Sequence, residues 1–198
     1  MVSIVQNFIC TKSERLDVVH RNTVKLGKTF PKSDFFINYN SDINFESIKK
    51  SYLENIPKIN LYNDLTKDWA LVTLALMKEV RTPYVVYICE DMEVNCSYDK
   101  MWDTLNEFMD NDYDLCFLSK IGKYIEKQYI DGYTPYNVIQ SPGYQKLKNG
   151  YFYLGKHAPH KRVPVDAIFK TEWMIERLEE FLEHGENCTH DIPHRKKH

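Results

Sequence analysis

The sequence predicts a single α/β domain with a mostly parallel central sheet flanked by helices. Strand-like and helix-like segments alternate through the first half of the 198-residue chain, and this order is typical of helices that cover both faces of a sheet. The strand-like segments are almost continuously apolar, which is typical of parallel strands buried on both faces. Apolar residues make up 43% of the chain and aromatic residues 14%, which is enough for a core of this kind.

Four short apolar runs before residue 90 predict strands. The first run is rich in β-branched and aromatic residues, and the fourth is the most hydrophobic in the chain. Such runs, bounded by turn-forming residues, indicate buried strands. The predicted strands are Val2–Cys10, Asp34–Tyr39, Lys58–Tyr62 and Tyr84–Cys89.

Helices are predicted between these strands, because apolar residues recur there at helical spacing and capping residues precede them. The predicted helices are Ser13 to about Lys25, Phe45–Asn55, and a third that opens at Thr66 or Asp68 and runs to Val80. The apolar positions of the first are Leu16, Val19 and Leu26, and those of the third are Leu71, Leu74, Ala75 and Val80.

The second half of the chain is less regular. A helix is expected from Asp99 to Met109, a strand at Asp114–Leu118, and a last helix from about Thr171. Between them, residues 122–155 hold five of the seven glycines and seven of the fourteen tyrosines, which predicts loops and short strands. Residues 1–186 are therefore expected to form the domain, and residues 187–198 a polar, basic tail.

Ligands of open parallel sheets bind beyond the carboxyl ends of the strands. The loops expected at that edge are Thr11–Arg15, Asn38–Asp42, Asn63–Trp69 and Glu90–Glu93. These four loops are therefore the predicted rim of a ligand site.

Composition excludes several classes of protein. A formal net charge of −2 gives no overall field for nucleic acid or a membrane surface. Gly27 is the only glycine in the first 121 residues, so a glycine-rich phosphate loop is excluded. Five irregularly spaced cysteines without a C-x-x-C pair argue against a zinc site or disulfide framework and favour a reducing compartment. The apolar stretches are too short to span a bilayer, so we expect a cytoplasmic protein without a transmembrane segment.

Three carboxylates follow the fourth strand within four residues, namely Glu90, Asp91 and Glu93. Like charges at a buried strand end repel each other, and a divalent cation would neutralise them. Carboxylate oxygens favour Mg²⁺ or Mn²⁺, ions that often hold the phosphates of a substrate at the same time. The alternative interpretation is a solvated acidic turn, in which these charges cost little.

Charge is also segregated along the chain. Residues 84–114 carry nine acids and one base, whereas residues 119–162 carry eight bases and two acids. An acidic, metal-binding rim opposite a basic, tyrosine-rich segment suits a sugar attached to a diphosphate, because tyrosine rings stack on sugars and bases. The alternative is two solvated faces that attract each other across the fold.

The ordered set of motifs resembles the GT-A type glycosyltransferases, specifically the inverting, family-2-like group that uses nucleotide sugars. Val2–Val5 and Thr11–Leu16 are similar to the first strand and the loop-helix start of that family. Phe36–Asp42 lies where the family has its second strand and acidic turn, and Glu90–Glu93 resembles the D-x-D region. The resemblance covers the first half of the chain.

The resemblance implies roles for individual residues. Asp91 would be the main metal ligand and Glu93 the second acid of a D-x-E variant, while Glu90 would contact the ribose or orient the site. Since Asn38 and Tyr39 replace the usual acid of the second strand, the preferred base is left open. The implied contacts to the nucleotide are Thr11, Lys12 and Arg15, then Asn38 or Asn40 near the base, and Asp68.

An inverting transfer also needs a carboxylate that takes a proton from the acceptor hydroxyl. Asp166 follows an extended, proline-containing stretch and is the favoured candidate. Glu172 is a second candidate, although an acid in the first turn also stabilises a helix. Glu186 is the third.

We therefore expect a metal-assisted enzyme that transfers a sugar, with inversion, from a nucleotide-diphosphate donor to a hydroxyl acceptor such as a glycan or polysaccharide. Two alternatives remain open. One is a sugar-phosphate nucleotidyltransferase, which usually carries a glycine-rich first loop. The other is a non-catalytic sugar- or protein-binding module on the same fold.

Overall fold

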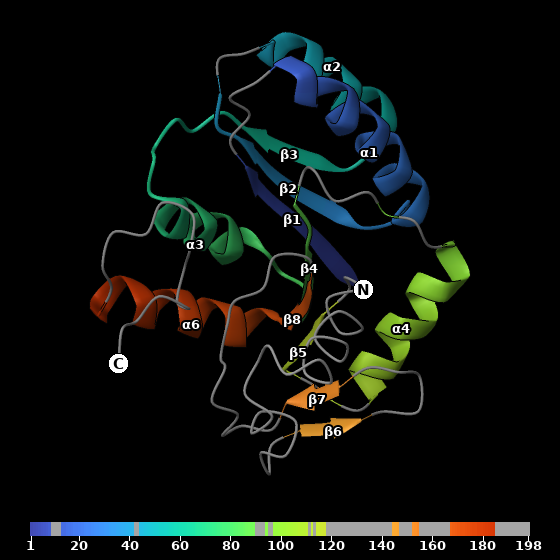
Figure 1. Cartoon of the computed structure of the whole chain (residues 1–198), viewed down its shortest axis with the longest axis vertical. Helices are drawn as coiled ribbons and strands as arrows, with labels where there is room; N and C mark the ends of the chain where they lie inside the picture. The colour runs from blue at the N-terminus through green and yellow to red at the C-terminus, as the bar shows by residue number, and fades with distance from the viewer. Residues whose placement is uncertain are drawn as a thin grey trace, which may run out of the picture.

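The computed structural model describes residues 1–8, 13–41, 44–89, 94, 97–110, 112, 114–117, 144–146, 152–154 and 167–184. Within these ranges the chain forms a six-stranded sheet, a two-stranded sheet and five α-helices (Figure 1). The predicted tail, residues 187–198, lies outside them, so the predicted boundary of the domain stays a prediction.

The large sheet is mostly parallel, as the sequence predicts. Its strand order is β3-β2-β1-β4-β8-β5, in which the first four strands run parallel and β8 runs antiparallel to both β4 and β5. Its strands are β1 (Val2–Phe8), β2 (Asp34–Tyr39), β3 (Ile59–Tyr62), β4 (Tyr84–Tyr87), β5 (Leu115–Phe117) and β8 (Ala167–Lys170). The small sheet pairs β6 (Tyr144–Lys146) with β7 (Phe152–Leu154), antiparallel.

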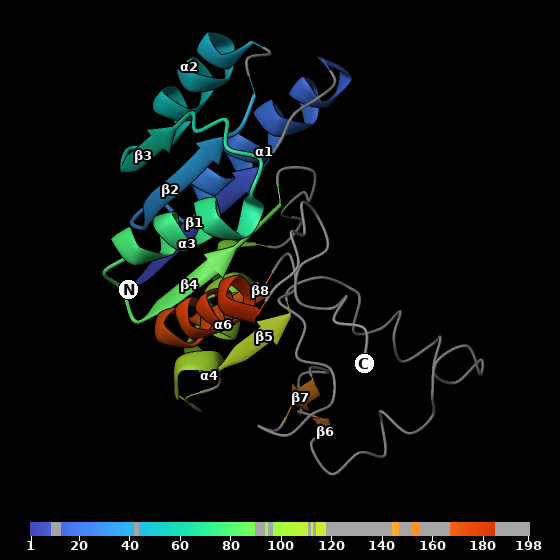
Figure 2. The ribbon, with the colours of Figure 1, turned by 90° about the vertical axis from the view of Figure 1, so that its left-hand side faces the viewer.

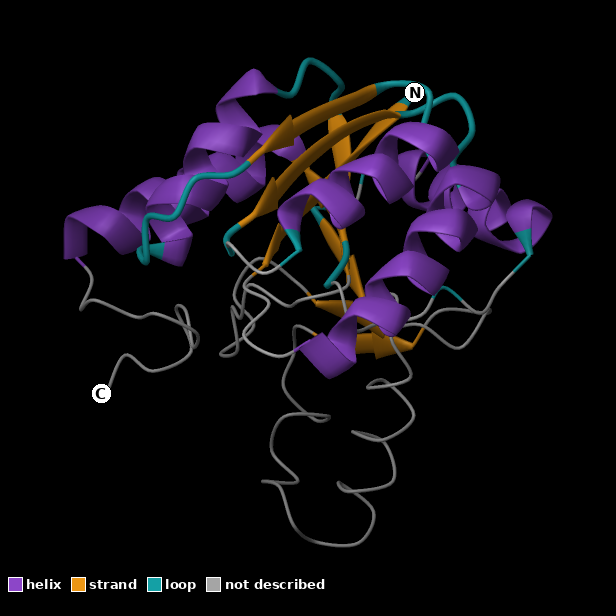
Figure 3. Ribbon diagram, turned by 90° about the horizontal axis from the view of Figure 1, so that it is seen from above, coloured by secondary structure: helices purple, strands orange, loops and turns teal. Residues whose placement is uncertain are grey.

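Helices cover both faces of the large sheet. Helices α1, α2 and α4 lie on one face, and α3 and α6 lie on the other (Figures 1 and 3). The helices are α1 (Leu16–Thr29, preceded by a 3₁₀ turn at Ser13–Arg15), α2 (Phe45–Asn55), α3 (Trp69–Glu79), α4 (Tyr98–Asp110) and α6 (Thr171–His184). No helix among the described residues is both long and apolar enough to cross a lipid bilayer.

The alternating side chains of the strands build two separate cores. In β1, Val2 and Ile4 pack beneath α1, α2 and α4, whereas Val5 packs beneath α3 and α6. The same alternation continues in β4, where Val86 and Val85 face opposite cores. Because successive side chains of a strand point to opposite faces, a strand covered on both sides is mostly apolar, which is the pattern that β4 shows; in β1 the buried Ser3, Gln6 and Asn7 are exceptions.

Two features of local structure were not predicted from the sequence. The first is strand β8, since its four residues fall between a proline-containing stretch and the last helix. The second is the buried face of α3: of the apolar residues named for this helix, Leu74 and Val80 are buried, whereas Leu71 is 51% exposed and Ala75 is exposed. Eight of the eleven residues of α3 are apolar, so periodicity did not identify its buried face.

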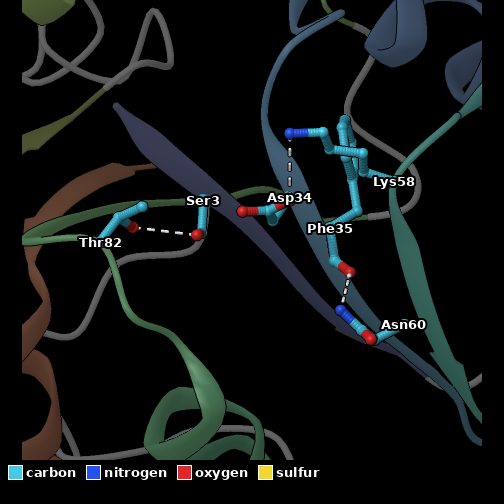
Figure 4. Close-up of polar contacts among 6 residues, drawn as sticks. All are labelled: Ser3, Asp34, Phe35, Lys58, Asn60 and Thr82. Atoms are coloured by element: carbon cyan, nitrogen blue, oxygen red, sulfur yellow. Dashed lines mark hydrogen bonds and ion pairs between the residues drawn. The ribbon is translucent and has the colours of Figure 1, made fainter.

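Polar contacts hold the amino ends of the strands together (Figure 4). The Thr82 hydroxyl donates to the Ser3 hydroxyl at 2.9 Å and joins the approach to β4 to β1. Lys58 pairs with Asp34 at 3.8 Å, and the Asn60 amide donates to the carbonyl of Phe35 at 3.3 Å. These contacts align β2 with β3 at the edge opposite the predicted ligand site.

Gly27 allows α1 and α2 to approach each other closely. A Cβ atom at this position would lie 2.1 Å from the carbonyl oxygen of Asn55, at the end of α2. A backbone atom cannot move aside as the end of a flexible side chain can. Glycine is therefore required here by the contact between the two helices.

Replacing Gly27 by Ala should lower the free energy of unfolding by about 1–3 kcal/mol, the usual cost of overpacking a core. In an exposed helix the same change would raise the free energy of unfolding by about 1 kcal/mol, so the sign of the change distinguishes the two situations. Urea unfolding measures this free energy. Ser47→Ala on the exposed side of α2 is the control, and a G27A protein as stable as wild type would contradict the close approach.

Candidate functional site

The parallel strands end at one edge of the sheet, and β8 begins there. The arrowheads of β2, β3 and β4 point the same way in Figure 2. At this carboxyl edge Phe8 of β1 pairs with Tyr39 of β2. Ala167, the first residue of β8, pairs with Tyr87, the last residue of β4. The first residue of β8 therefore lies at the edge where β4 ends.

A buried network of amides lies near this edge, beneath α3. Asn7 is 6% exposed and Asn38 is 0% exposed. The Asn38 amide donates to the side-chain oxygen of Asn7 at 3.1 Å. The Asn7 amide in turn donates to the Trp69 carbonyl at 3.2 Å and the Thr73 hydroxyl at 2.9 Å. The Tyr87 hydroxyl donates to the Asn7 carbonyl at 3.0 Å. The network therefore joins β1, β2 and β4 to the first turns of α3.

The segment from residue 63 to residue 68, called the rim segment below, connects β3 to α3 and is held by side-chain amides. Asn38 donates to the carbonyl of Asp64 at 3.1 Å and accepts from the N–H of Asp64 at 2.8 Å. Asn63 donates to the carbonyls of Tyr39 and Ser41 at 2.6 and 2.9 Å. Asn40 donates to the carbonyl of Thr66. These bonds attach the segment to the end of β2.

Side chains 63–67 are exposed although the backbone between them is held. Within this segment Asp64 accepts the N–H of Thr66 at 2.8 Å. Hydrogen bonds from the Thr66 side chain and then from its backbone lower the pKa of Asp64 below the usual 3.8. The rim segment therefore presents an ionised carboxylate to solvent at the carboxyl edge.

The remaining carboxylate whose pKa is lowered within the described residues lies at the opposite edge. Lys170, at the end of β8, pairs with Asp112 at 2.9 Å and with Asp114 at 3.3 Å. Its hydrogen bond lowers the pKa of Asp112, and burial together with the charge of Asp112 raises the pKa of Tyr84. This cluster contacts the start of β4 and is far from the candidate site, so we regard it as structural.

The structure describes four of the predicted site residues. Arg15 is exposed at the junction of the 3₁₀ turn with α1. Asn38 and Asn40 both reach the rim segment, and Asp68 ends it by capping α3, where its carboxylate accepts the N–H of Leu71 at 3.0 Å. Three of the four therefore gather around one loop. Their contacts to a nucleotide stay predictions.

The other predicted site residues lie outside the described ranges. They are Thr11, Lys12, Glu90, Asp91, Glu93 and Asp166. Within the described ranges, no group of three or more His, Cys, Asp or Glu side chains is arranged to hold a metal ion. The predicted metal ligands are not among the residues this finding covers.

Of two residues that organise this edge, the sequence analysis missed Asn7, whereas it placed Asn63 in the predicted rim loop Asn63–Trp69 without assigning it a role. Asn7 is one of three polar residues, with Ser3 and Gln6, in the fully buried strand β1. A buried amide without a partner is costly, so a polar residue in such a strand indicates a designed contact. That signal could have identified Asn7. Asn63 lies in a polar stretch and offered no comparable signal.

Of the candidate bases, Glu172 lies in the part of the chain that the structure describes. Glu172 follows β8 in the first turn of α6, and α6 starts at the amino edge, where the N–H of Thr171 donates to the carbonyl of Pro83 at 2.9 Å. Glu172 therefore lies beyond the end of β8 that is remote from the rim segment. Ala167 lies at the other end, beside Tyr87.

No protein-family model matches the chain, and no curated protein matches its sequence. Solved structures do match. The chain resembles the mannosyltransferase PcManGT from Pyrobaculum calidifontis, solved with GDP-Man and Mn²⁺, with a TM-score of 0.55 and 13% identity. The match covers 95% of this chain and 47% of that one, so the chain spans about half the length of that enzyme.

Two nucleotidyltransferases are similar to the same degree. 4-Diphosphocytidyl-2C-methyl-D-erythritol synthase from Anaerococcus prevotii matches with a TM-score of 0.54 and 12% identity over 96% of this chain and 79% of that one. A cytidylyltransferase from Leptospira borgpetersenii matches with a TM-score of 0.54 and 9% identity over 98% and 68%. These likenesses confirm the expected GT-A type, nucleotide-diphospho-sugar transferase fold. At such identities they show the fold alone.

Removing the cap of α3 should weaken the fold. Asp68→Ala is expected to lower the free energy of unfolding by about 1 kcal/mol, the usual cost of losing an N-cap side chain. Asp68→Ser keeps a capping oxygen and should lose much less. Urea unfolding of both variants measures the difference, and equal stability of D68A and wild type would show that the cap contributes nothing.

The pKa of Asp64 should depend on the hydroxyl of Thr66. Thr66→Val removes that hydroxyl and keeps the backbone donor, so the pKa of Asp64 should rise toward 3.8 without reaching it. A lowered carboxyl pKa stabilises the fold above the unfolded pKa, and this stability is lost as pH falls through the folded pKa. NMR titration of the carboxyl carbon measures the shift. Thr104→Val on α4 is the control, and an unchanged Asp64 titration in T66V would refute the contact.

Proposed function

We propose that the chain is a glycosyltransferase that moves a sugar from a nucleotide-diphosphate donor to a hydroxyl acceptor, with inversion at the anomeric carbon. The observation that carries this proposal is the antiparallel strand β8. It begins beside the last residue of β4, so the segments that precede β8 and follow β4 leave from the same edge of the sheet. These two segments contain Asp166 and the acids Glu90, Asp91 and Glu93.

The nucleotide would lie over the carboxyl ends of β1, β2 and β3, as ligands of open α/β sheets commonly do. Asn40 donates to the rim segment at this edge and Asp68 is the last residue of that segment, which supports their expected role close to the nucleotide. Thr11, Lys12 and Arg15 follow β1 in the sequence. We propose that these three residues contact the nucleotide from the other side of the same edge.

A divalent cation fits the chemistry of the proposed ligands. Asp91 and Glu93 would hold Mn²⁺ or Mg²⁺ through hard carboxylate oxygens, and Glu90 would contact the ribose or orient the site. The ion would stabilise the negative charge on the departing diphosphate as a Lewis acid. Neutralisation by the cation also explains how three acids can follow the most hydrophobic strand of the chain.

Asp166 is the proposed catalytic base. Its carboxylate would take the proton of the acceptor hydroxyl while the hydroxyl oxygen bonds to the anomeric carbon. The bond from that carbon to the diphosphate breaks, and the nucleoside diphosphate leaves with the electron pair. Glu172 is disfavoured for this role, because α6 begins at the opposite edge of the sheet.

Nucleotidyl transfer is the second candidate. The solved structures of this class resemble the chain as closely as the mannosyltransferase does, with TM-scores of 0.54 and 0.54 against 0.55. The scarcity of glycine argues against nucleotidyl transfer, since Gly27 is the only glycine before residue 122. The two activities differ in their products. A glycosyltransferase releases a nucleoside diphosphate, whereas a nucleotidyltransferase consumes a triphosphate and releases pyrophosphate.

Calorimetry with Mn²⁺ and a panel of nucleoside diphosphates (UDP, GDP, CDP, ADP and dTDP) tests the donor site. At least one should bind in the presence of Mn²⁺, and at least tenfold more weakly with EDTA. Asp91→Asn should weaken this binding at least tenfold at an unchanged melting temperature. Asp99→Asn, which changes an acid on the described helix α4, is the matched control and should bind as wild type does.

Product analysis then separates the candidates. Release of a nucleoside diphosphate from a nucleotide sugar supports glycosyl transfer, and Asp166→Asn should abolish that release while donor binding is retained. Pyrophosphate release from a nucleoside triphosphate and a sugar phosphate would favour the second candidate. Absence of metal-dependent binding to every nucleoside diphosphate of the panel would contradict glycosyl transfer.

A further inference from the structure

We propose that Asn38 is a positioning residue, whose buried amide fixes the rim segment in the conformation that receives the donor nucleotide. This inference rests on the proposed function for the identity of the ligand. It assigns different roles to Asn38, which lies in β2, and to Asn40, which directly follows this strand. Asn40 remains the candidate for direct contact, and Asn38 acts through the backbone of Asp64.

The hydrogen bonds of Asn38 leave no donor for a ligand. Its amide nitrogen carries two hydrogens, of which one goes to Asn7 and the other to the carbonyl of Asp64. Its oxygen accepts the N–H of Asp64 at 2.8 Å. The side chain is fully buried. Asn38 therefore forms hydrogen bonds with both backbone groups of Asp64, its N–H and its carbonyl, as a residue of a neighbouring strand would.

The rim segment depends on such bonds because little apolar packing holds it. Side chains 63–67 are all exposed, and Leu65, its apolar residue, is 46% exposed. In a loop of this kind, hydrogen bonds to the body of the protein set the conformation of the backbone. Burying an amide is favourable only when its donors and acceptor are satisfied, so the network tolerates one arrangement of the segment.

The same network fixes where the segment lies relative to the rest of the edge. Asn7 connects Asn38 to the Thr73 hydroxyl on α3 and, through its carbonyl, to Tyr87 at the end of β4. The end of β4 precedes the three acids proposed to hold the cation. Asn38 and Asn7 therefore connect the part of the edge proposed for the nucleotide with the part proposed for its diphosphate.

The test compares Asn38→Ser with Asn60→Ser. Both variants remove an amide that donates from a strand of the sheet to a backbone carbonyl. Asn38 acts at the carboxyl side, on Asp64, whereas Asn60 acts at the amino side, on Phe35 (Figure 4). Hydrogen exchange of a peptide covering residues 63–68 and calorimetric affinity for the nucleoside diphosphate that binds wild type best are measured on the full chain. N38S should raise exchange and weaken affinity at least tenfold each, whereas N60S should change neither more than twofold.

A milder variant covers the case in which N38S does not fold. Thr73→Val keeps the shape of the side chain and removes the hydroxyl that accepts from Asn7, so it should produce the same two effects to a smaller extent, about threefold. In turnover assays both variants should raise KM for the donor more than they lower kcat, since the reacting groups are untouched.

The outcomes distinguish the inference from the proposed function. Faster exchange of residues 63–68 with unchanged nucleotide affinity would overturn the role in ligand binding, and unchanged exchange would overturn the positioning itself. If wild type binds no nucleoside diphosphate, the proposed function fails. The exchange measurement still decides whether Asn38 holds the segment.

Discussion

One buried side chain, Asn7, connects most of the elements on which the candidate site depends. Its side-chain nitrogen donates to the Trp69 carbonyl and the Thr73 hydroxyl of α3, and its side-chain oxygen accepts from Asn38. The backbone carbonyl of the same residue accepts from the Tyr87 hydroxyl. An unsatisfied buried amide costs about 1–3 kcal/mol, so each of these partners must stay in place for the strand to remain buried. The position of α3 relative to β1, β2 and β4 is therefore set by hydrogen bonds as well as by apolar packing.

This arrangement divides the α3 face of the sheet into two regions. Toward the amino edge the strands contribute apolar side chains such as Val85 and Phe169, which pack against α3 and α6. Toward the carboxyl edge β1 and β2 contribute Asn7 and Asn38 instead. Apolar packing tolerates small shifts of a loop, whereas paired amides fix donors and acceptors in direction as well as distance. A site that binds a polar ligand needs the second kind of support.

The fold could be predicted from sequence because it depends on patterns that are local. Continuous apolar runs predicted four parallel strands, and Val19 and Leu26 correctly identified the buried face of α1. Strand β8 was missed because four residues between a proline and a helix carry no clear period. The buried face of α3 was not predicted, because eight of the eleven residues of that helix are apolar, so only its contacts with the sheet and α6 identify it.

Less of the candidate site than of the fold could be predicted from the sequence, and the reason is physical. Sequence predicts which loops reach the carboxyl edge, and Asn38, Asn40 and Asp68 do meet at the rim segment. It does not predict partners, because Asn38 reaches Asp64 and Asn7 over separations of 26 and 31 residues. An amide in a strand can bind a ligand or hold a backbone, and only the geometry distinguishes the two.

The antiparallel strand has a consequence that a wholly parallel sheet would lack. A parallel strand in the place of β8 would begin at the amino edge and send its following residues to the ligand site. Because β8 runs the other way, Ala167 pairs with Tyr87 and Lys170 pairs with Tyr84. In β8 the chain therefore passes from the carboxyl edge of the parallel strands to their amino edge. The first residue of β8 therefore lies at the carboxyl edge, whereas Thr171, which follows its last residue, lies at the amino edge. This direction is the reason why we propose a base from the segment before β8 rather than Glu172 of the helix after it.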